Sequence, residues 1–543
     1  MEIISLKLSE SPQIFSDYLS STGNVSQFFP HNFRDSWDAV LTERGKTDYP
    51  RKGMATLLEE QNRHWNAPEA SLENIQKLQD RNTFAVVTGQ QAGFYGGPLY
   101  TFYKTMTVLK LTKKLQKEYP QYQFVPVFWI EVNDSDFAEI AAIQYLNKEN
   151  QLTRLSVEEP AEDAQKPIAA RKLDDQILAW QQQLADDFFD TEFKDSALQT
   201  LKTCFNSGRP IVDAFAELLL QTFGRHGLVC LNPAGKAVCE LAGDLFKNSL
   251  AEPEKIVDAF ADRSNALQTA GYQPQIRFQP NQTLLFFNDS DMRRVRIDRG
   301  DDGQFQLKYP DGYRSAEKDH LLKACSERPE YLSPNVALRP IMQDTLLPTV
   351  AYVAGPSEMA YFGQVAALYE YFNLPMPVIY PRHRITLSEK KVDKNVQKNN
   401  ADYAELLAGN PNFIEEFLRK HSSQTLFQSV ESVERQIKDA LESLRTLIAE
   451  NDQTLVGQLD KTRQNIEGSF GKLSGRITRS LEEKNKIQVN QLERVLQHLM
   501  PESTFQERKI NIIYFAIKYG MGFLDELYEL LPEDTSSHYV VKL

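Results

Sequence analysis

The strongest constraint on the fold lies in residues 83–140. This stretch begins with a short apolar, β-branched run, Thr83 to Thr88, which is typical of a buried strand. A glycine-rich turn follows, and Pro98 then stands where the first residue of a helix is expected. Apolar side chains continue at helical spacing until a second apolar run, Phe124 to Ile130. The order of strand, turn, helix and strand predicts half of a doubly wound α/β sheet.

The turn between this strand and this helix suits an anionic ligand. Four of the nine residues from Gly89 to Gly97 are glycines, which let backbone N–H groups approach a ligand closely. The helix N-terminus behind the turn adds unpaired N–H groups and partial positive charge. The spacing matches neither a dinucleotide-binding fingerprint nor a P-loop, so a tight structural turn explains the glycines equally well.

An acidic cluster follows the second strand and consists of Glu131, Asp134, Asp136 and Glu139. In open α/β sheets, ligands bind beyond the carboxyl ends of the strands, where both the turn and this cluster should lie. Carboxylates there could hold a metal, a substrate amine or a ribose hydroxyl. The alternative is a helix-capping loop. We favour function for Asp134 and Asp136, and capping for Ser135 and Glu139.

The length and charge of the chain limit the classes of protein that it can belong to. At 543 residues it is too long for one compact core, which predicts two or three domains. A net charge of −13 argues against binding to nucleic acid or to acidic membranes. There is no secretory signal, no apolar run long enough to span a membrane and no Cys-x-x-Cys pair. We therefore expect a cytoplasmic protein in a reducing environment.

Two insertions are expected within an α/β core that spans residues 1–385. Residues from about 145 to 225 have the periodicity of helices, and residues from about 272 to 330 indicate a small antiparallel sheet. The strands expected in that sheet are Gln275–Phe278, Leu284–Phe287, Arg293–Ile297 and Phe305–Tyr309.

Residues 331–385 are expected to return to the core. Thr349 to Val353 predicts a strand, and a Gly-Pro turn at Gly355 then opens a helix. Glu358, in the first turn of that helix, either stabilises the helix N-terminus or receives a substrate amine. Arg382 follows the last predicted strand, where a guanidinium could clamp a phosphate or a carboxylate.

Residues 386–504 predict a coiled coil. Apolar positions recur at intervals of seven residues in two registers, Val430, Ile437 and Leu444, and Val433, Ala440 and Leu447. Two antiparallel helices, or pairing between subunits, would bury this seam. The aromatic and apolar segment 505–543 is expected to pack back on the core.

Long blocks of sequence carry a resemblance to a known family. They are VTGQQAGFYGGPLYTFYK, VPVFWIEVNDSDFAEI, YLSPNVALRPIMQDTLLPTVAYVAGPSEMAYFGQ and MPVIYPR. In these blocks, and over nearly its whole length, the chain resembles the bacillithiol biosynthesis cysteine-adding enzymes, the BshC cysteine ligase family. One departure follows the second strand, where the family usually reads Glu-Asp-His-Asp. This chain has Asn133 and Ser135 in place of the glutamate and the histidine.

The resemblance implies a Rossmann-like doubly wound core with insertions, a C-terminal coiled-coil domain and a homodimer. It also implies a ligase that forms a carbon–nitrogen (amide) bond between cysteine and glucosaminyl-malate, in the last step of bacillithiol biosynthesis. Because joining a free carboxylate to an amine is uphill, we hypothesise that ATP or another nucleotide activates the cysteine carboxylate. Mg²⁺ is a further candidate.

On this hypothesis the catalytic residues are Asp134, Asp136 and Glu358. The residues expected to bind substrate or nucleotide are Gly89, Gln90, Gln91, Gly93, Gly96, Gly97, Gln343, Asp344, Gly355 and Arg382. Two alternatives stay open at this point. One is a non-enzymatic coiled-coil protein whose core binds a nucleotide, and the other is a ligase for a different amino-sugar or thiol acceptor.

Overall fold

The computed structural model describes residues 1–8, 12–300, 303–422 and 424–543. The chain divides into two compact units. The first, called the core unit below, consists of Met1–Thr386 and Gln506–Val541. The second, called the hairpin unit, consists of Leu387–Phe505 and Lys542–Leu543. Each unit is described by itself.

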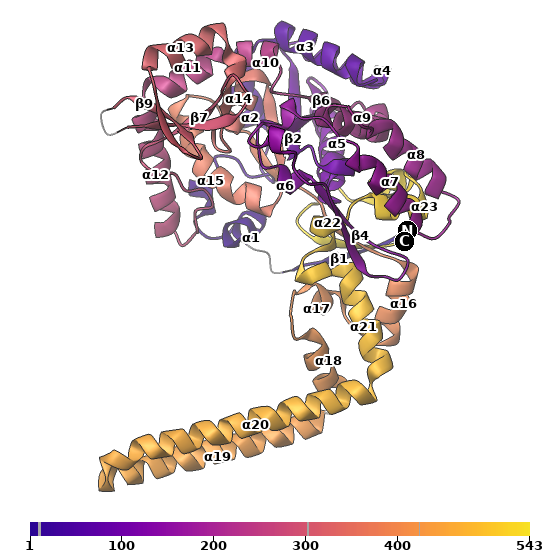
Figure 1. Cartoon of the computed structure of the whole chain (residues 1–543), viewed down its shortest axis with the longest axis vertical. Helices are drawn as coiled ribbons and strands as arrows, with labels where there is room; N and C mark the ends of the chain where they lie inside the picture. Colours follow the sequence, from indigo (N-terminus) through magenta and orange to yellow (C-terminus); the bar gives the residue numbers. More distant parts are fainter. Residues whose placement is uncertain (9–11, 301–302, 423) are drawn as a thin grey trace. The chain divides into compact units, whose positions relative to one another are not determined.

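A parallel five-stranded sheet lies at the centre of the core unit (Figure 1). Its strands are β2 (Thr83–Gln91), β3 (Gln123–Glu131), β6 (Val229–Leu231), β12 (Thr349–Ala354) and β13 (Val378–Pro381), in the order β13-β12-β2-β3-β6. The first strand of this sheet, β2, is therefore central. The chain continues to β3 and β6 on one side of β2 and later adds β12 and β13 on the other side. This order confirms the predicted doubly wound core, with its switch point between β2 and β12.

Local sequence explains why β2 and β3 occupy the centre. Both are continuous apolar runs, and the side chains from Thr83 to Gly89 and from Phe124 to Ile130 are buried, as expected for a sheet covered on both faces. Their register pairs Thr83 with Gln123 and Gln91 with Glu131, so both strands end at the same edge. The crossover helix α5 (Tyr100–Glu118) is buried without interruption from Thr101 to Leu109.

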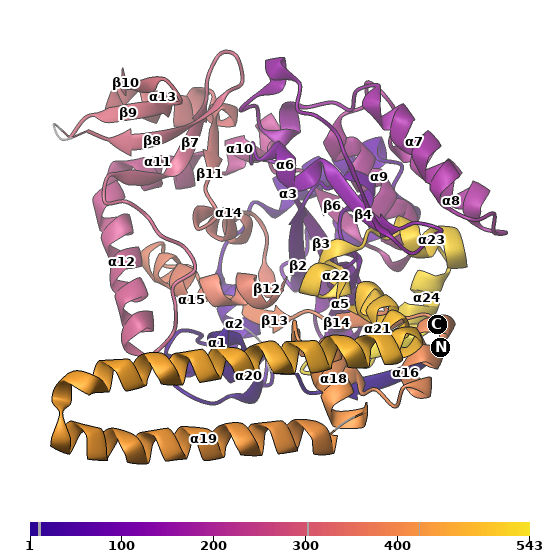
Figure 2. The same cartoon turned by 60° about the horizontal axis from the view of Figure 1, so that its bottom comes forward.

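The insertions contain both helices and strands. After an antiparallel hairpin of β4 (Ala142–Leu146) and β5 (Leu152–Ser156) come the helices α7, α8 and α9 (Gln176–Asp187, Lys194–Cys204 and Ile211–Phe223). The second insertion is an antiparallel sheet in the order β10-β9-β8-β7-β11, which Figure 2 shows beside α11. Its strands are β7 (Gln282–Asn288), β8 (Arg294–Arg299), β9 (Phe305–Tyr309), β10 (Gly312–Ala316) and β11 (Leu332–Pro334).

One predicted strand of this insertion, Gln275–Phe278, is wrong, because the structure has no strand there. The side chain of Gln364, in α15 (Pro356–Tyr371), supplies the reason. Its Oε1 accepts hydrogen bonds from the N–H groups of Gln275 (2.8 Å) and Ile276 (2.9 Å), and its Nε2 donates to the Ile276 carbonyl (2.8 Å). One buried carboxamide thus satisfies the backbone groups that a neighbouring strand would otherwise pair.

The hairpin unit is helical and confirms the predicted long helices. Helices α19 (Gln424–Asn451) and α20 (Val456–Lys484) lie side by side and run in opposite directions (Figures 1 and 2). Asp452 stops α19 by accepting the N–H of Thr454 at 2.9 Å, and a single turn of 3₁₀ helix then leads into α20. The other helices of this unit are α16 (Lys390–Lys398), α17 (Tyr403–Leu407), α18 (Phe413–Ser422) and α21 (Lys486–Leu499).

The rest of the core unit surrounds the central sheet. Its other helices are α1 (Gln13–Ser20), α2 (Asp38–Lys46), α3 (Arg51–His64), α4 (Glu69–Lys77), α6 (Phe137–Ile140), α10 (Lys236–Leu241), α11 (Gly243–Ala251), α12 (Pro253–Thr269), α13 (Lys318–Glu327), α14 (Leu338–Leu346), α22 (Gln506–Lys509), α23 (Ile513–Tyr519) and α24 (Phe523–Leu530). A third sheet has the order β1-β15-β14 (Glu2–Leu6, His538–Lys542 and Arg384–Ser388). Among the described residues, no helix is both long and apolar enough to cross a membrane.

Two buried histidines make the stability of the core unit depend on pH. Burial lowers the pKa of His383 and of His538 to about 4. In the unfolded chain both imidazoles take up protons below about pH 6.5, so between pH 6.5 and 4 the unfolded state binds more protons than the folded state. We therefore expect the free energy of unfolding to fall by about 1 kcal/mol per histidine between pH 7.5 and 5.5.

Urea unfolding followed by tryptophan fluorescence measures this, because all four tryptophans lie in the core unit. His383→Gln keeps a neutral side chain and should lose about half of the pH dependence. The explanation fails if the variant and the wild type lose equal stability on acidification.

Candidate active site

A pocket opens at the carboxyl edge of the central sheet, where the strand order reverses. Its volume is about 370 Å³, which suits a small molecule. Residues at the carboxyl ends of β2, β3 and β12 and in the segments after these strands and after β13 line the pocket. Arg294 and Pro334 to Val336, from the small antiparallel sheet and the loop after it, line it as well. The structure brings seven of the predicted site residues to this pocket: Gly89, Gln90, Gln91, Asp134, Gly355, Glu358 and Arg382.

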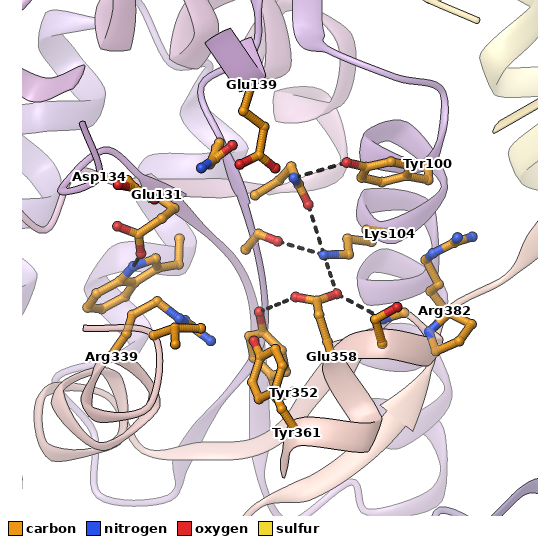
Figure 3. A pocket seen from close by; sticks show the side chains of 18 of the residues that line it. Tyr100, Lys104, Glu131, Asp134, Glu139, Arg339, Tyr352, Glu358, Tyr361 and Arg382 are labelled. Atoms are coloured by element: carbon orange, nitrogen blue, oxygen red, sulfur yellow. Dashed lines mark hydrogen bonds and ion pairs between the residues drawn. The ribbon is translucent and has the colours of Figure 1, made fainter. Parts of the chain in front are cut away.

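A buried ion pair joins the two halves of the sheet at this edge (Figure 3). Lys104 of α5 lies 2.5 Å from Glu358 of α15, and it also donates to the Gly89 carbonyl (2.8 Å) and to Gln90 Oε1 (3.1 Å). Burial lowers the pKa of Lys104, although Glu358 opposes this effect. With three acceptors, the ammonium group has no free donor for a ligand.

Glu358 is held by further donors. Its Oε2 accepts the N–H of Gly355 (2.9 Å) and its Oε1 accepts the hydroxyl of Tyr352 (3.0 Å). Burial acts to raise the pKa of Glu358, but Lys104 and the Gly355 N–H outweigh it and hold the pKa below its usual value. The carboxylate is therefore ionised, and one lone pair of Oε1 remains available to a substrate donor.

Arg382 lines the pocket, but its guanidinium is already paired. Its two terminal nitrogens donate to both carboxylate oxygens of Glu507, at 2.9 and 2.5 Å. Nη1 also donates to the His383 carbonyl at 2.8 Å. Glu507 belongs to α22, so the segment predicted to pack back on the core supplies the counter-ion. The predicted phosphate clamp is thus a buried structural pair in this structure.

The acidic loop after β3 divides into two roles. Asp134 faces the pocket, where its Oδ1 lies 3.4 Å from Arg294 Nη1. Asp136 does not line the pocket, because its side chain caps α6 by accepting the N–H of Glu139 at 3.3 Å. Neither Asn133 nor Ser135 is among the pocket-lining residues. The two departures from the family pattern therefore lie beside the site rather than in its wall.

The second half of the glycine turn also lies outside the pocket. A Cβ on Gly93 would stand 2.8 Å from the Cα of Gly97, and a Cβ on Gly96 would stand 2.7 Å from the Phe102 ring. Gly96 and Gly97 also have positive φ angles, 85° and 69°. Close packing explains these glycines. The turn is held from behind by Asn511, whose Nδ2 donates to the Gly97 carbonyl at 2.8 Å.

Gln343 and Asp344 do not reach the pocket, contrary to their predicted place in its wall. Both are fully buried in α14. Asp344 accepts from Arg44 (3.0 Å), from the hydroxyl of Tyr369 (2.6 Å) and from Gln343 Nε2 (2.9 Å). Gln343 in turn accepts from Arg339 Nη1 at 3.1 Å. These residues therefore position Arg339, which does line the pocket.

Arg339 is the functional candidate that the sequence analysis missed. Its side chain is 93% buried, and its Nη2 has no hydrogen-bond partner among the described residues. Burial acts to lower its pKa, but Tyr352, Tyr361 and Glu131 raise it, so the side chain stays charged. A buried donor without an acceptor costs about 1–3 kcal/mol, which an anionic ligand would recover. The only sequence signal was an arginine between the apolar residues Leu338 and Pro340.

The cysteines of the chain offer no reactive thiol. Cys204, Cys230, Cys239 and Cys325 are all free and buried. Burial raises the pKa of each thiol, to about 12 for Cys204, Cys239 and Cys325. Because a thiolate is the nucleophilic form, none of them is suited to forming a thioester with a substrate.

Comparison with known proteins places the whole chain in one family. The N-terminal Rossmann-like domain of the bacillithiol biosynthesis protein BshC matches residues 1–383, and its C-terminal coiled-coil domain matches residues 385–543. A relative from Salinibacter ruber is 34% identical over 98% of this chain and 96% of its own length. Relatives from Chloroherpeton thalassium (31% identical, 98% and 97%) and Anoxybacillus flavithermus (29%, 100% and 100%) are similar throughout. Each is named "Putative cysteine ligase BshC".

The buried pair of Arg44 and Asp344 gives a prediction about stability. Asp344→Asn leaves the guanidinium of Arg44 buried without its counter-ion, and such a change costs about 3–5 kcal/mol. We expect the urea midpoint of tryptophan fluorescence to fall accordingly. The double variant Arg44→Met with Asp344→Leu removes both charges and should be more stable than Asp344→Asn. If Asp344→Asn keeps wild-type stability, Asp344 is not needed to compensate the buried charge of Arg44.

Proposed function

Because the chain belongs to the bacillithiol biosynthesis BshC family, we propose that it is a cysteine ligase that joins the carboxyl group of cysteine to the amino group of glucosaminyl-malate. The observation that carries the proposal is the match of both family domains, which together span residues 1–383 and 385–543. The relatives that bear the ligase name align over nearly their full lengths, so the chain has the parts that they have.

The pocket supports a reaction between a carboxylate and an amine. It combines an unsatisfied cationic donor, Arg339 Nη2, with the ionised carboxylate of Glu358. The cation suits a carboxylate, and the remaining lone pair of Glu358 suits an ammonium or amine group. In the proposed reaction Glu358 would orient the amine of the acceptor, while Lys104 keeps Glu358 ionised.

The proposal includes activation of the cysteine carboxylate by ATP or another nucleotide, because a free carboxylate does not form an amide spontaneously. Gly89 to Gln91 and the exposed Arg508 line the same pocket and could face the phosphates. Among the described residues, no three histidine, cysteine, aspartate or glutamate side chains gather into a metal site. Mg²⁺ often needs only one or two carboxylates when phosphates complete its shell, and Asp134 and Glu139 would supply them.

The reaction also suggests where the protein works. Cysteine has to carry a reduced thiol into the product, and the cytoplasm keeps thiols reduced. We therefore include a cytoplasmic location in the proposal.

The ligation itself is tested by mass spectrometry of the full chain with cysteine, glucosaminyl-malate, ATP and magnesium. We expect a product heavier by one cysteine residue, and none without ATP. Glu358→Gln should lower turnover at least tenfold, because it removes the charge that holds Lys104 and the amine. Glu370→Gln is the matched control, since Glu370 lies in the same helix and is largely exposed.

Each other outcome of this assay has a defined meaning. Product without ATP would retain the ligase and refute the activation step. Product only with a different amino sugar or thiol would change the acceptor. No product, together with nucleotide binding, would favour the non-enzymatic alternative.

We also propose that the hairpin unit pairs with a second copy of the chain. Apolar side chains at heptad spacing stay exposed along α19, at Leu426, Val433, Ala440 and Leu447. Since α20 does not bury this register, a further helix pair is needed to cover it. A second copy is the occupant we favour, because it carries the same stripe and a symmetric pair would bury both stripes at once.

The pairing is tested by light scattering coupled to size-exclusion chromatography. We expect a dimer for the wild type and a monomer for the double variant Val433→Glu with Leu447→Glu, because buried unpaired charges break an apolar seam. Ser432→Glu with Thr446→Glu adds the same charge at exposed neighbouring positions and should remain dimeric. A wild-type monomer at micromolar concentration would refute the pairing.

A further inference from the structure

One buried cation of the pocket, Arg339, has a terminal nitrogen without a hydrogen-bond partner among the described residues. Arg294 has its own partners, because it donates to Ser333 Oγ (3.2 Å) and to the Pro334 carbonyl (3.1 Å) and lies 3.4 Å from Asp134. Lys104 has an acceptor for each of its three donors, and both terminal nitrogens of Arg382 donate to Glu507. Arg339 differs, since Nη1 donates to Gln343 while the buried Nη2 has no hydrogen-bond partner among the described residues. The guanidinium also interacts with the hydroxyl of Tyr361.

A series of side-chain contacts fixes the position of Arg339 in α14. Gln343 holds Nη1, and Asp344 holds Gln343 in turn through a contact of 2.9 Å. Arg44 and Tyr369 fix Asp344 from the core. The guanidinium also lies 5.0 Å from the centre of the Tyr352 ring. This chain of contacts fixes the guanidinium in the pocket wall with one donor unpaired.

A carboxylate lies on the same side of the pocket. Figure 3 shows Glu131 and Arg339 on the same side of the pocket. Glu131 accepts one hydrogen bond at each oxygen, from the Asn133 N–H (3.1 Å) and from Trp129 Nε1 (3.3 Å), so each oxygen keeps a lone pair. Within the described part of the chain, no ion pair joins Glu131 to Arg339. Burial raises the pKa of Glu131, and the charge of Arg339 opposes this rise.

We propose that Arg339 and Glu131 form the subsite for the zwitterionic group of an α-amino acid, with Arg339 binding its carboxylate and Glu131 its ammonium group. In the ligase reaction this amino acid is cysteine, so the assignment rests on the proposed function. A free amino acid carries both charges on one carbon, which matches an adjacent cation and anion that do not neutralise each other. A purely anionic ligand would leave Glu131 beside a second negative charge.

The subsite also gives a reason for the direction of the reaction. Cysteine has an amine of its own, which could attack an activated carboxylate of another cysteine. An ammonium group held by Glu131 keeps its proton and has no lone pair with which to attack. The amine of the acceptor would then be the only amine near the carboxylate that can attack it.

The first test uses the wild-type chain and four ligands in calorimetric titrations under reducing conditions. L-Cysteine should bind at least tenfold more tightly than N-acetylcysteine, which lacks the charged amine, and cysteamine, which lacks the carboxylate. L-Malate represents a purely anionic ligand, and it should also bind at least tenfold more weakly than L-cysteine. If N-acetylcysteine or L-malate binds as tightly as cysteine, Arg339 serves an anion of the acceptor instead, and the proposal is wrong.

The second test separates the two halves of the subsite. Glu131→Gln should weaken cysteine at least tenfold and leave N-acetylcysteine unchanged. Arg339→Lys keeps the charge but loses the planar donor pair, so it should weaken both ligands and leave cysteamine unchanged. The surface substitutions Glu327→Gln and Arg314→Lys are the matched controls and should change nothing. Equal binding of cysteine by Glu131→Gln and wild type would remove the ammonium half.

Cysteine binding could require that the nucleotide binds first, and a further titration addresses this case. The titrations are repeated with magnesium and a non-hydrolysable ATP analogue, and an absence of cysteine binding in both conditions overturns the subsite. Steady-state kinetics distinguish this failure from that of the proposed function. If ligation occurs but Glu131→Gln raises the KM for the acceptor rather than for cysteine, the ligase stands and the subsite falls. If cysteine binds as expected but no ligation occurs, the subsite stands and the ligase falls.

Discussion

The ion pair between Lys104 and Glu358 is the interaction on which the pocket depends. It crosses the switch point, because Lys104 follows β2 and Glu358 follows β12. Two charges buried together stabilise a fold only when further hydrogen bonds satisfy them, and here Gly89, Gln90, Gly355 and Tyr352 do so. Since this pair is complete, it shapes the pocket, and an anionic ligand would need a different cation.

Two more buried pairs fix parts of the chain that lie far apart in sequence. Arg44 meets Asp344 across 300 residues, and Arg382 meets Glu507 across 125. Removing one partner of either pair lowers the free energy of unfolding, because the remaining charge stays buried without a counter-ion. Asp344 also holds Gln343, which in turn holds Arg339. The wall of the pocket is therefore fixed by buried side chains rather than formed by loops alone. This rigidity is what a preorganised binding site requires.

More of the fold than of the candidate site could be predicted from the sequence. Continuous apolar strands and a glycine turn are local signals, and they correctly indicated the doubly wound sheet and the edge at which the pocket opens. Asp134 and Glu358 followed from their positions after strands. Gln343 and Asp344 were misplaced because a polar pair in a helix does not reveal which way it faces. Arg339 was missed since its importance lies in an absent partner, and only the packed structure shows which donors are satisfied.

The return of residues 506–541 to the core unit has a consequence for synthesis of the protein. Glu507 supplies the counter-ion of Arg382, and Asn511 supports the glycine turn. The ribosome makes both residues only after the entire helical unit of residues 387–505. A nascent chain therefore carries an uncompensated Arg382 and an unsupported turn until Glu507 and Asn511 have been made. The pocket thereby depends on residues made after the helical unit, so a product terminated before Glu507 would lack a finished pocket even though its central sheet had been synthesised.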